Sequence, residues 1–176
     1  MHNKPLFVTL EPIQNRHIMW KPYVMGDIIY GRFSQNEWHK IADDIDSETE
    51  LYELLIQYPH MIQGFVLYDK YNNEPIAFAY LLKESKNKTV SFYGGGWGKS
   101  TRLTMLYMQG TMLLIEHLLQ QGYKVRTYCA VDNLNAYRFM NSLGFVRYLT
   151  TQQKIYQWIN LKRLYKSAMY NYLQTR

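Results

Sequence analysis

The chain has 176 residues, of which 47% are hydrophobic, and this length and composition suit a single globular domain spanning residues 1–176. A lone cysteine, Cys129, excludes an internal disulfide, and because no Cys/His pair has zinc-ligand spacing we expect no metal. The net charge of +6 arises in residues 101–176, where 10 Lys and Arg face 2 Asp and Glu, and it favours an anionic partner such as a phosphorylated cofactor, nucleic acid or an acidic surface.

The N-terminal third predicts one strand and two helices. Phe7–Leu10 is an apolar run typical of a strand. The pairs Ser34/Glu37 and Ser47/Glu50 each have the spacing of a capping box, in which two side chains satisfy backbone N–H groups at a helix start. We therefore expect a helix to begin after Ser34 and another after Ser47.

Three apolar runs in the middle of the chain, residues 64–68, 76–82 and 89–93, predict consecutive strands. Short polar segments separate them, and polar turns of this length join antiparallel neighbours. We expect these strands to form an antiparallel meander.

A glycine-rich segment follows the third of these strands. It consists of Tyr93, Gly94, Gly95, Gly96, Trp97, Gly98, Lys99, Ser100, Thr101 and Arg102. Helical periodicity then begins near Arg102 and ends at Gly122. A glycine turn between a strand and a helix N-terminus is typical of a phosphate site, because the backbone can approach the ligand closely and the first helical N–H groups are unpaired. A tight turn that binds nothing fits the same pattern.

The C-terminal part predicts a further strand at 124–131, parallel to the strand at 89–93 because a long helix joins them. Asp132 or Asn133 caps a short helix over 134–143. Two strands follow, at 146–151 and 154–159, and then an amphipathic helix begins at Leu161. This last helix packs on its own domain or serves as a surface for homo-oligomer formation.

The segment Asn133–Phe145 contains Asn-x-x-Ala followed by Gly-Phe. Together with the order of elements, this segment resembles the GNAT superfamily of acetyl-CoA-dependent N-acetyltransferases. The resemblance implies an α/β fold with a mixed, mostly antiparallel sheet flanked by helices, to which this chain adds the C-terminal amphipathic helix. It also implies that acetyl-CoA lies in a wedge between the strands at 89–97 and 124–131, with its phosphates on the following helix N-terminus.

The resemblance assigns the glycine-rich segment from Tyr93 to Arg102, together with Asn133, to the cofactor. The phosphate loop of the family aligns with residues 102–107, which retain the arginine but lack both family glycines. The tyrosine that often acts as general acid aligns with Met140, which has no proton to give. Tyr137, Tyr128 and Cys129 are the candidates to replace it, and water is another.

The sequence therefore predicts an acetyl-CoA-dependent N-acetyltransferase that moves an acetyl group to an amine of an unidentified acceptor. A protein that keeps the fold and binds acyl-CoA or a partner without catalysis is the first alternative, and a nucleic-acid-binding module is the second. A nucleotide-hydrolysing P-loop is disfavoured because Tyr93 stands where that motif requires its first glycine. Apolar runs far shorter than a membrane span, and no apolar secretion signal, predict a cytoplasmic protein without a membrane partner.

Overall fold

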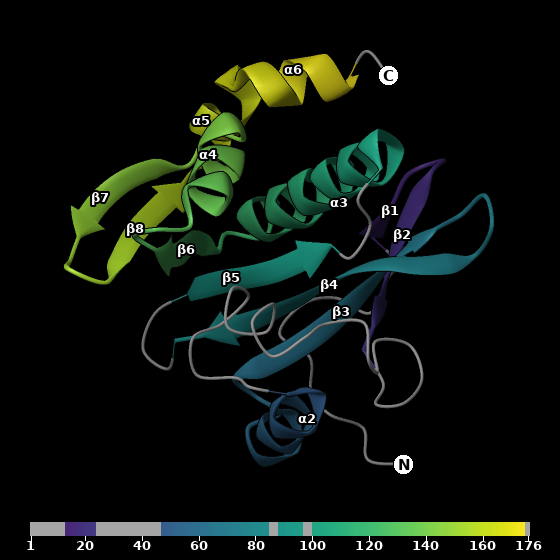
Figure 1. Cartoon of the computed structure of the whole chain (residues 1–176), viewed down its shortest axis with the longest axis horizontal. Coiled ribbons are helices and arrows are strands. Elements are labelled where there is room, and N and C mark those ends of the chain that lie inside the picture. The colour runs from purple at the N-terminus through teal and green to yellow at the C-terminus, as the bar shows by residue number, and fades with distance from the viewer. Residues whose placement is uncertain (1–12, 24–46, 85–87, 97–99, 175–176) are drawn as a thin grey trace.

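A computed structural model describes residues 13–23, 47–84, 88–96 and 100–174 (Figure 1). Within these ranges, eight strands form one sheet in the order β1-β2-β3-β4-β5-β6-β8-β7. All neighbouring strands are antiparallel except β5 and β6, which are parallel. The strands are β1 (Ile13–Gln14), β2 (Ile18–Pro22), β3 (Ile62–Asp69), β4 (Glu74–Lys83), β5 (Thr89–Gly96), β6 (Lys124–Ala130), β7 (Val146–Thr150) and β8 (Lys154–Ile159).

The helices of these ranges cover both faces of the sheet (Figure 1). They are α2 (Glu48–Gln57), α3 (Thr101–Gln120), α4 (Leu134–Ser142), α5 (Leu161–Lys166) and α6 (Ala168–Gln174). The expected mixed, mostly antiparallel sheet with flanking helices is confirmed.

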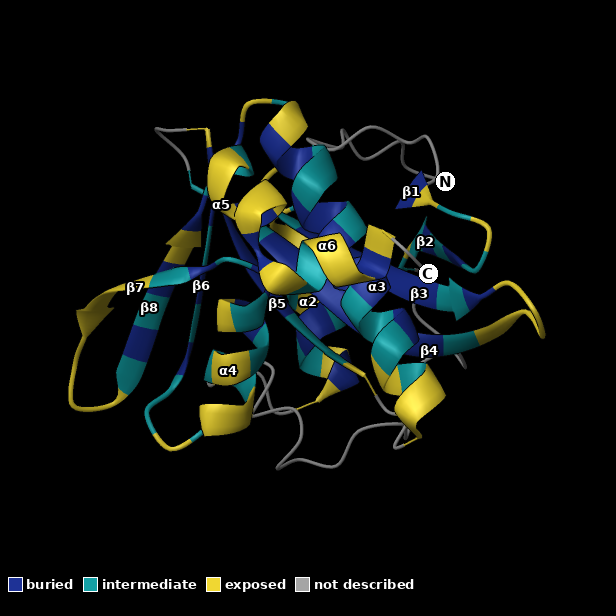
Figure 2. Ribbon diagram, turned by 90° about the horizontal axis from the view of Figure 1, so that it is seen from above, coloured by how far each residue is buried: buried dark blue, intermediate teal, exposed yellow. Residues whose placement is uncertain are grey.

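Helix α3 lies across one face and joins the larger core, where buried residues concentrate (Figure 2). Gly110 allows this close approach, since a Cβ there would lie only 2.5 Å from Leu67 Cδ2 of β3. Trp20 of β2 donates from Nε1 to the Gly110 carbonyl oxygen at 2.7 Å. These two contacts fix the helix over the N-terminal half of the sheet.

Helix α2 covers the opposite face and begins as predicted at Ser47, whose side chain accepts from the Glu50 N–H at 3.3 Å. Its apolar side packs Leu51 and Leu55 against the sheet. The smaller core that results also contains Val66, Phe78, Tyr80 and Tyr93.

The prediction of a glycine turn directly after Tyr93 is wrong for Gly94–Gly96, which form the end of a strand. Gly94–Gly96 continue β5 and pair with residues 77–79 of β4. The long neighbouring strand supplies backbone partners, and this tertiary pairing overrides the low strand propensity of glycine. Trp97, Gly98 and Lys99 lie outside the described residues. The predicted helix follows, with Ser100 as its N-cap.

The remaining local predictions have mixed outcomes. Gly122 ends α3 with φ of +87°, and Asn133 caps α4, both as predicted. The short strands β1 and β2 were not predicted. The strand expected at Phe7–Leu10 and the helix expected after Ser34 lie outside the described residues.

The prediction of one continuous C-terminal helix is wrong, because Ser167 divides it into α5 and α6. Ser167 has extended ψ of 143°. Its hydroxyl donates to the Leu164 carbonyl at 2.8 Å and accepts from the Tyr170 N–H at 3.1 Å, ending one helix and capping the next. Leu164 and Leu173 are both buried in the larger core, so this segment packs on its own domain. None of the described helices is long and apolar enough to span a membrane.

Candidate functional site

The two parallel strands separate partway along their length. Residues 89–91 of β5 pair with residues 124–126 of β6, and both strands continue well beyond this short ladder. Where they diverge, Thr127 Oγ1 donates to the Phe92 carbonyl oxygen at 2.7 Å. The strands beyond this bond form the two sides of a wedge.

The backbone of β5 faces into the wedge at alternate residues. Successive residues of a strand direct their N–H and C=O groups to opposite neighbours. The Phe92 carbonyl points towards β6, so Gly94 and Gly96 direct their backbone groups the same way, while β6 has already turned aside. The wedge therefore offers backbone donors and acceptors to a ligand.

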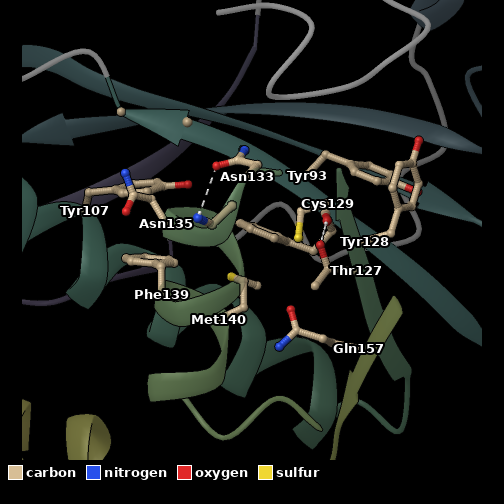
Figure 3. A pocket seen from close by; sticks show the side chains of 15 residues that line it. Tyr93, Tyr107, Thr127, Tyr128, Cys129, Asn133, Asn135, Phe139, Met140 and Gln157 are labelled. Carbon is tan, nitrogen blue, oxygen red and sulfur yellow. Dashed lines mark hydrogen bonds between the residues drawn. The ribbon is translucent and has the colours of Figure 1, made fainter. Parts of the chain in front are cut away.

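A cavity of about 340 Å³ occupies the wedge (Figure 3). Tyr107 of α3 and Phe139 of α4 stack with ring centroids 5.2 Å apart. Tyr93 of β5 and Tyr128 of β6 meet edge to face at 4.9 Å across the diverging strands. The lining consists of Phe92, Tyr93, Gly94, Gly95, Gly96, Tyr107, Thr127, Tyr128, Cys129, Asn133, Asn135, Ala136, Phe139, Met140 and Gln157.

The structure brings together only part of the sequence-predicted site. Tyr93, the three following glycines, Asn133 and Tyr128 line the cavity, whereas Tyr137 on α4 is half-buried and does not. Ser100, Thr101 and Arg102 form the start of α3 and are also outside the lining.

Arg102 is used within the fold. Its guanidinium donates from Nη1 to Asp69 Oδ2 at 2.6 Å. Asp69 is almost completely buried, whereas the Arg102 side chain is 54% exposed. This hydrogen bond holds the pKa of the Asp69 carboxyl below its ordinary value. Asp69 Oδ1 also accepts from the Tyr71 N–H at 3.0 Å. The arginine thus links the start of α3 to the end of β3.

The described lining contains no carboxylate, imidazole or amine. Its titratable groups are three phenols and the Cys129 thiol. Desolvation raises the pKa of the Tyr107 phenol, which therefore stays protonated at neutral pH as a hydrogen-bond donor. These residues can bind and orient a ligand but include no strong base. The residues that the structure describes also include no His/Cys/Asp/Glu group that could hold a metal ion.

Sequence reasoning missed Thr127, Tyr107, Phe139, Asn135 and Gln157. Of these, Gln157 left a signal in the sequence, because it stands between Ile155 and Ile159 on the buried face of a strand. A polar residue at such a position needs a partner. Thr127 belongs to β6, one side of the wedge, whereas Tyr107, Asn135 and Phe139 are brought to the cavity by the packing of α3 and α4 against the wedge.

No protein-family model and no curated protein matches the chain. Solved structures do match it. A spermidine N-acetyltransferase from Vibrio cholerae, in complex with CoA and spermine, is 15% identical with a TM-score of 0.65, over 85% of this chain and 99% of that one. A putative acetyltransferase from T. thermophilus is 14% identical with a TM-score of 0.72, over 97% and 99%. A GCN5-related N-acetyltransferase from Brucella melitensis is 12% identical with a TM-score of 0.68, over 98% and 86%.

The chain has the GNAT fold.

The wedge contains Met140, the residue that the sequence resemblance aligned with the general acid of the GNAT superfamily. Met140 is buried and lines the cavity between α4 and β8 (Figure 3). A thioether has no proton to donate. Any proton delivered in this cavity must therefore come from another group or from water.

Proposed function

We propose that this GNAT-fold chain binds acetyl-CoA in the wedge and transfers the acetyl group to an amine. The observation that carries the proposal is the divergence of β5 and β6, which directs the backbone groups of Gly94 and Gly96 into a cavity. Extended ligands with amide groups pair with such strand edges. The structural neighbours are named as acetyltransferases, which supports the same chemistry.

The cofactor phosphates are assigned to the segment from Gly96 to Arg102. Helix α3 is 20 residues long with no acidic residue in its first turn, so its N-terminus favours an anion. Ser100 Oγ already accepts from the Leu103 N–H at 3.1 Å, which leaves the earlier N–H groups for a ligand. Trp97, Gly98 and Lys99 remain predicted contacts.

Acetyl transfer from a thioester to an amine requires little covalent chemistry from the side chains. A deprotonated amine attacks the acyl carbon of acetyl-CoA, the C–S bond breaks, and CoA leaves as a thiolate that takes a proton from water. The chain holds the reactants together and offers backbone N–H groups to the developing oxyanion. Because the described lining lacks a base, the amine loses its proton to water or before it binds.

Acyl-CoA binding without catalysis is the alternative that a specific observation favours, namely Met140 at the acid position. Release of CoA thiol from acetyl-CoA in the presence of an amine panel separates the two functions, and spermine belongs in that panel because one structural neighbour binds it. Binding with no thiol release for any amine supports the alternative.

Acetyl-CoA is expected to raise the melting temperature. Ligand at about 100 times its Kd adds roughly 2.7 kcal/mol to the free energy of unfolding. Differential scanning fluorimetry measures this shift. No shift at millimolar CoA contradicts the proposal, and steeply salt-dependent binding of a DNA or RNA probe would instead favour nucleic-acid binding.

Asn133→Ala is expected to weaken acetyl-CoA binding and to cost about 0.5–2 kcal/mol of stability, because the side chain both lines the cavity and caps α4. Its Oδ1 accepts from the Ala136 N–H at 3.3 Å. Asn133→Ser keeps a capping oxygen but loses the amide. Calorimetric titration should show weaker acetyl-CoA binding in both variants. Thermal melts should show lost stability only in the alanine variant. If the serine variant binds like wild type, Asn133 is only a cap.

Arg102→Ala is expected to weaken CoA binding about tenfold at low salt, because a charge-assisted contact to phosphate is lost. The deficit should shrink as salt rises. The variant should also melt lower, since it leaves the buried Asp69 carboxylate without its partner.

Asp69→Asn is the matched control, since it breaks the same ion pair but keeps the Arg102 charge. It should bind CoA at least as well as wild type in titrations at two salt concentrations. Equal affinity of Arg102→Ala and wild type at low salt would place the phosphate site elsewhere.

A further inference from the structure

Gln157 is a buried amide with no hydrogen-bond partner among the described residues. Its side chain lies on β8 and has no exposed surface. Within the described part of the chain, neither its Oε1 nor its Nε2 is paired. Buried side-chain polar atoms in native proteins nearly always have partners, because an unpaired one keeps its full desolvation cost. The direction in which the Gln157 amide points therefore indicates where its hydrogen-bond partner would lie.

The amide points into the wedge. Gln157 belongs to the lining of the cavity, and Figure 3 shows its amide directed from β8 towards Met140. The neighbours on its own strand face, Ile155 and Ile159, are apolar and buried. Gln157 is thus the one polar side chain on the buried face of β8, a strand that the structure describes in full, and it lies against a space large enough for a ligand.

The register of the sheet places Gln157 at the closed end of the wedge. It pairs directly with Thr127, which is the first β6 residue beyond the β5–β6 ladder. On β5, the residue beside Thr127 is Phe92, whose carbonyl oxygen accepts from Thr127 Oγ1. Gly96, where β5 ends before α3, lies about 13 Å from Phe92 along β5, at a rise of about 3.3 Å per residue. A ligand with its phosphates near the start of α3 would extend its other end towards Gln157.

We propose that Gln157 is a substrate-binding residue whose amide N–H donates a hydrogen bond to the thioester end of acetyl-CoA. This inference rests on the proposed acyl-CoA function. An amide donates and accepts hydrogen bonds but does not give up a proton at neutral pH. Gln157 therefore orients the thioester beside Met140 and does not act as the general acid.

The inference predicts opposite effects of one substitution on stability and on binding. Gln157→Met keeps the length of the side chain and removes the unpaired amide, so the ligand-free protein should melt at a higher temperature. Its affinity for acetyl-CoA should fall about tenfold, because the thioester then lacks its donor.

Gln63→Met is the matched control. Gln63 of β3 is also buried with both amide atoms unpaired among the described residues, but it does not line the wedge cavity. Its replacement should raise the melting temperature in the same way and leave acetyl-CoA affinity unchanged. A loss of affinity in both variants would overturn the specific role of Gln157.

Gln157→Glu supplies a second readout. A neutral carboxyl has an O–H donor, whereas a carboxylate has none. Burial raises the pKa of a glutamate in an apolar site, so lowering the pH should restore acetyl-CoA binding to this variant relative to wild type. A purely structural role gives no such recovery.

Isothermal titration of acetyl-CoA into wild type and the three variants, with thermal melts of each, decides the question. Wild type that does not bind acetyl-CoA overturns the proposed function itself. Wild type that binds, with Gln157→Met equally tight, overturns only the assignment of Gln157. Gln157→Met that melts lower than wild type shows a structural role and also overturns the assignment.

Discussion

Gly96→Val is expected to weaken acetyl-CoA binding about a hundredfold while the protein stays folded. A Cβ at Gly96 would lie 3.4 Å from Tyr107 Cγ and 3.6 Å from Cδ1, which are ordinary contact distances. The backbone therefore accepts a side chain here, and valine in place of glycine favours a strand. Its two methyl groups would fill the space between β5 and Tyr107 that the ligand needs. A hundredfold loss corresponds to about 2.7 kcal/mol.

Gly94→Ala provides the contrast within the same strand. A Cβ at Gly94 would lie 2.9 Å from the Phe78 carbonyl oxygen, a backbone atom that cannot move aside easily. This substitution should cost about 1–3 kcal/mol of stability through overpacking. Calorimetric titration and thermal melts of both variants test the pair. Unchanged affinity of Gly96→Val would move the ligand out of the wedge.

Most of the features that were predicted correctly from the sequence depend on residues a few positions apart, and one depends on the length of a connection. The caps at Ser47 and Asn133 and the left-handed Gly122 are set by side chains and dihedral preferences within one helical turn. The parallel pairing of β5 and β6 follows from the length of their connection. Local chemistry decides the caps and the left-handed glycine, and connection length decides the strand pairing, so one sequence contains the information for each.

The errors occur where a distant segment decides the structure. Gly94–Gly96 have turn-like composition but extend β5, since β4 offers paired backbone along its full length. Strand β1 is short and directly follows Pro12, and β2 ends at Pro22. Strand β2 is defined by its pairing with β3, more than 40 residues later in the chain. Strand propensity is weak beside such tertiary pairing.

The cavity was only partly predictable for the same reason. Asn133 belongs to a recognisable segment, whereas Gln157 reaches the wedge through its register with Thr127. That register depends on the pairing of β6 with β8 across the intervening α4 and β7. Alternation along β8 marks Gln157 as buried, but only the folded sheet indicates which cavity it faces.

Gly144→Ala is expected to destabilise the fold by about 3 kcal/mol or more, the largest stability effect that we predict. Gly144 follows α4 with φ of +103°, where a side chain is strained. A Cβ there would also lie 2.6 Å from the Arg163 carbonyl oxygen and 2.9 Å from its carbonyl carbon. These atoms belong to α5, which Leu164 anchors in the larger core. Strain and overpacking therefore add at this position.

Gly122→Ala separates the two contributions, because Gly122 shares the positive φ, at +87°, but has open space around it. The atom nearest its Cβ position is Lys88 Nζ, at 3.5 Å on a flexible side chain. This variant should lose only the backbone term, about 1–2 kcal/mol. Urea unfolding of both variants, with m-values compared to wild type, measures the difference. Equal losses would mean that α5 moves away from α4 at little cost and that the C-terminal helices are held mainly by Leu164 and Leu173.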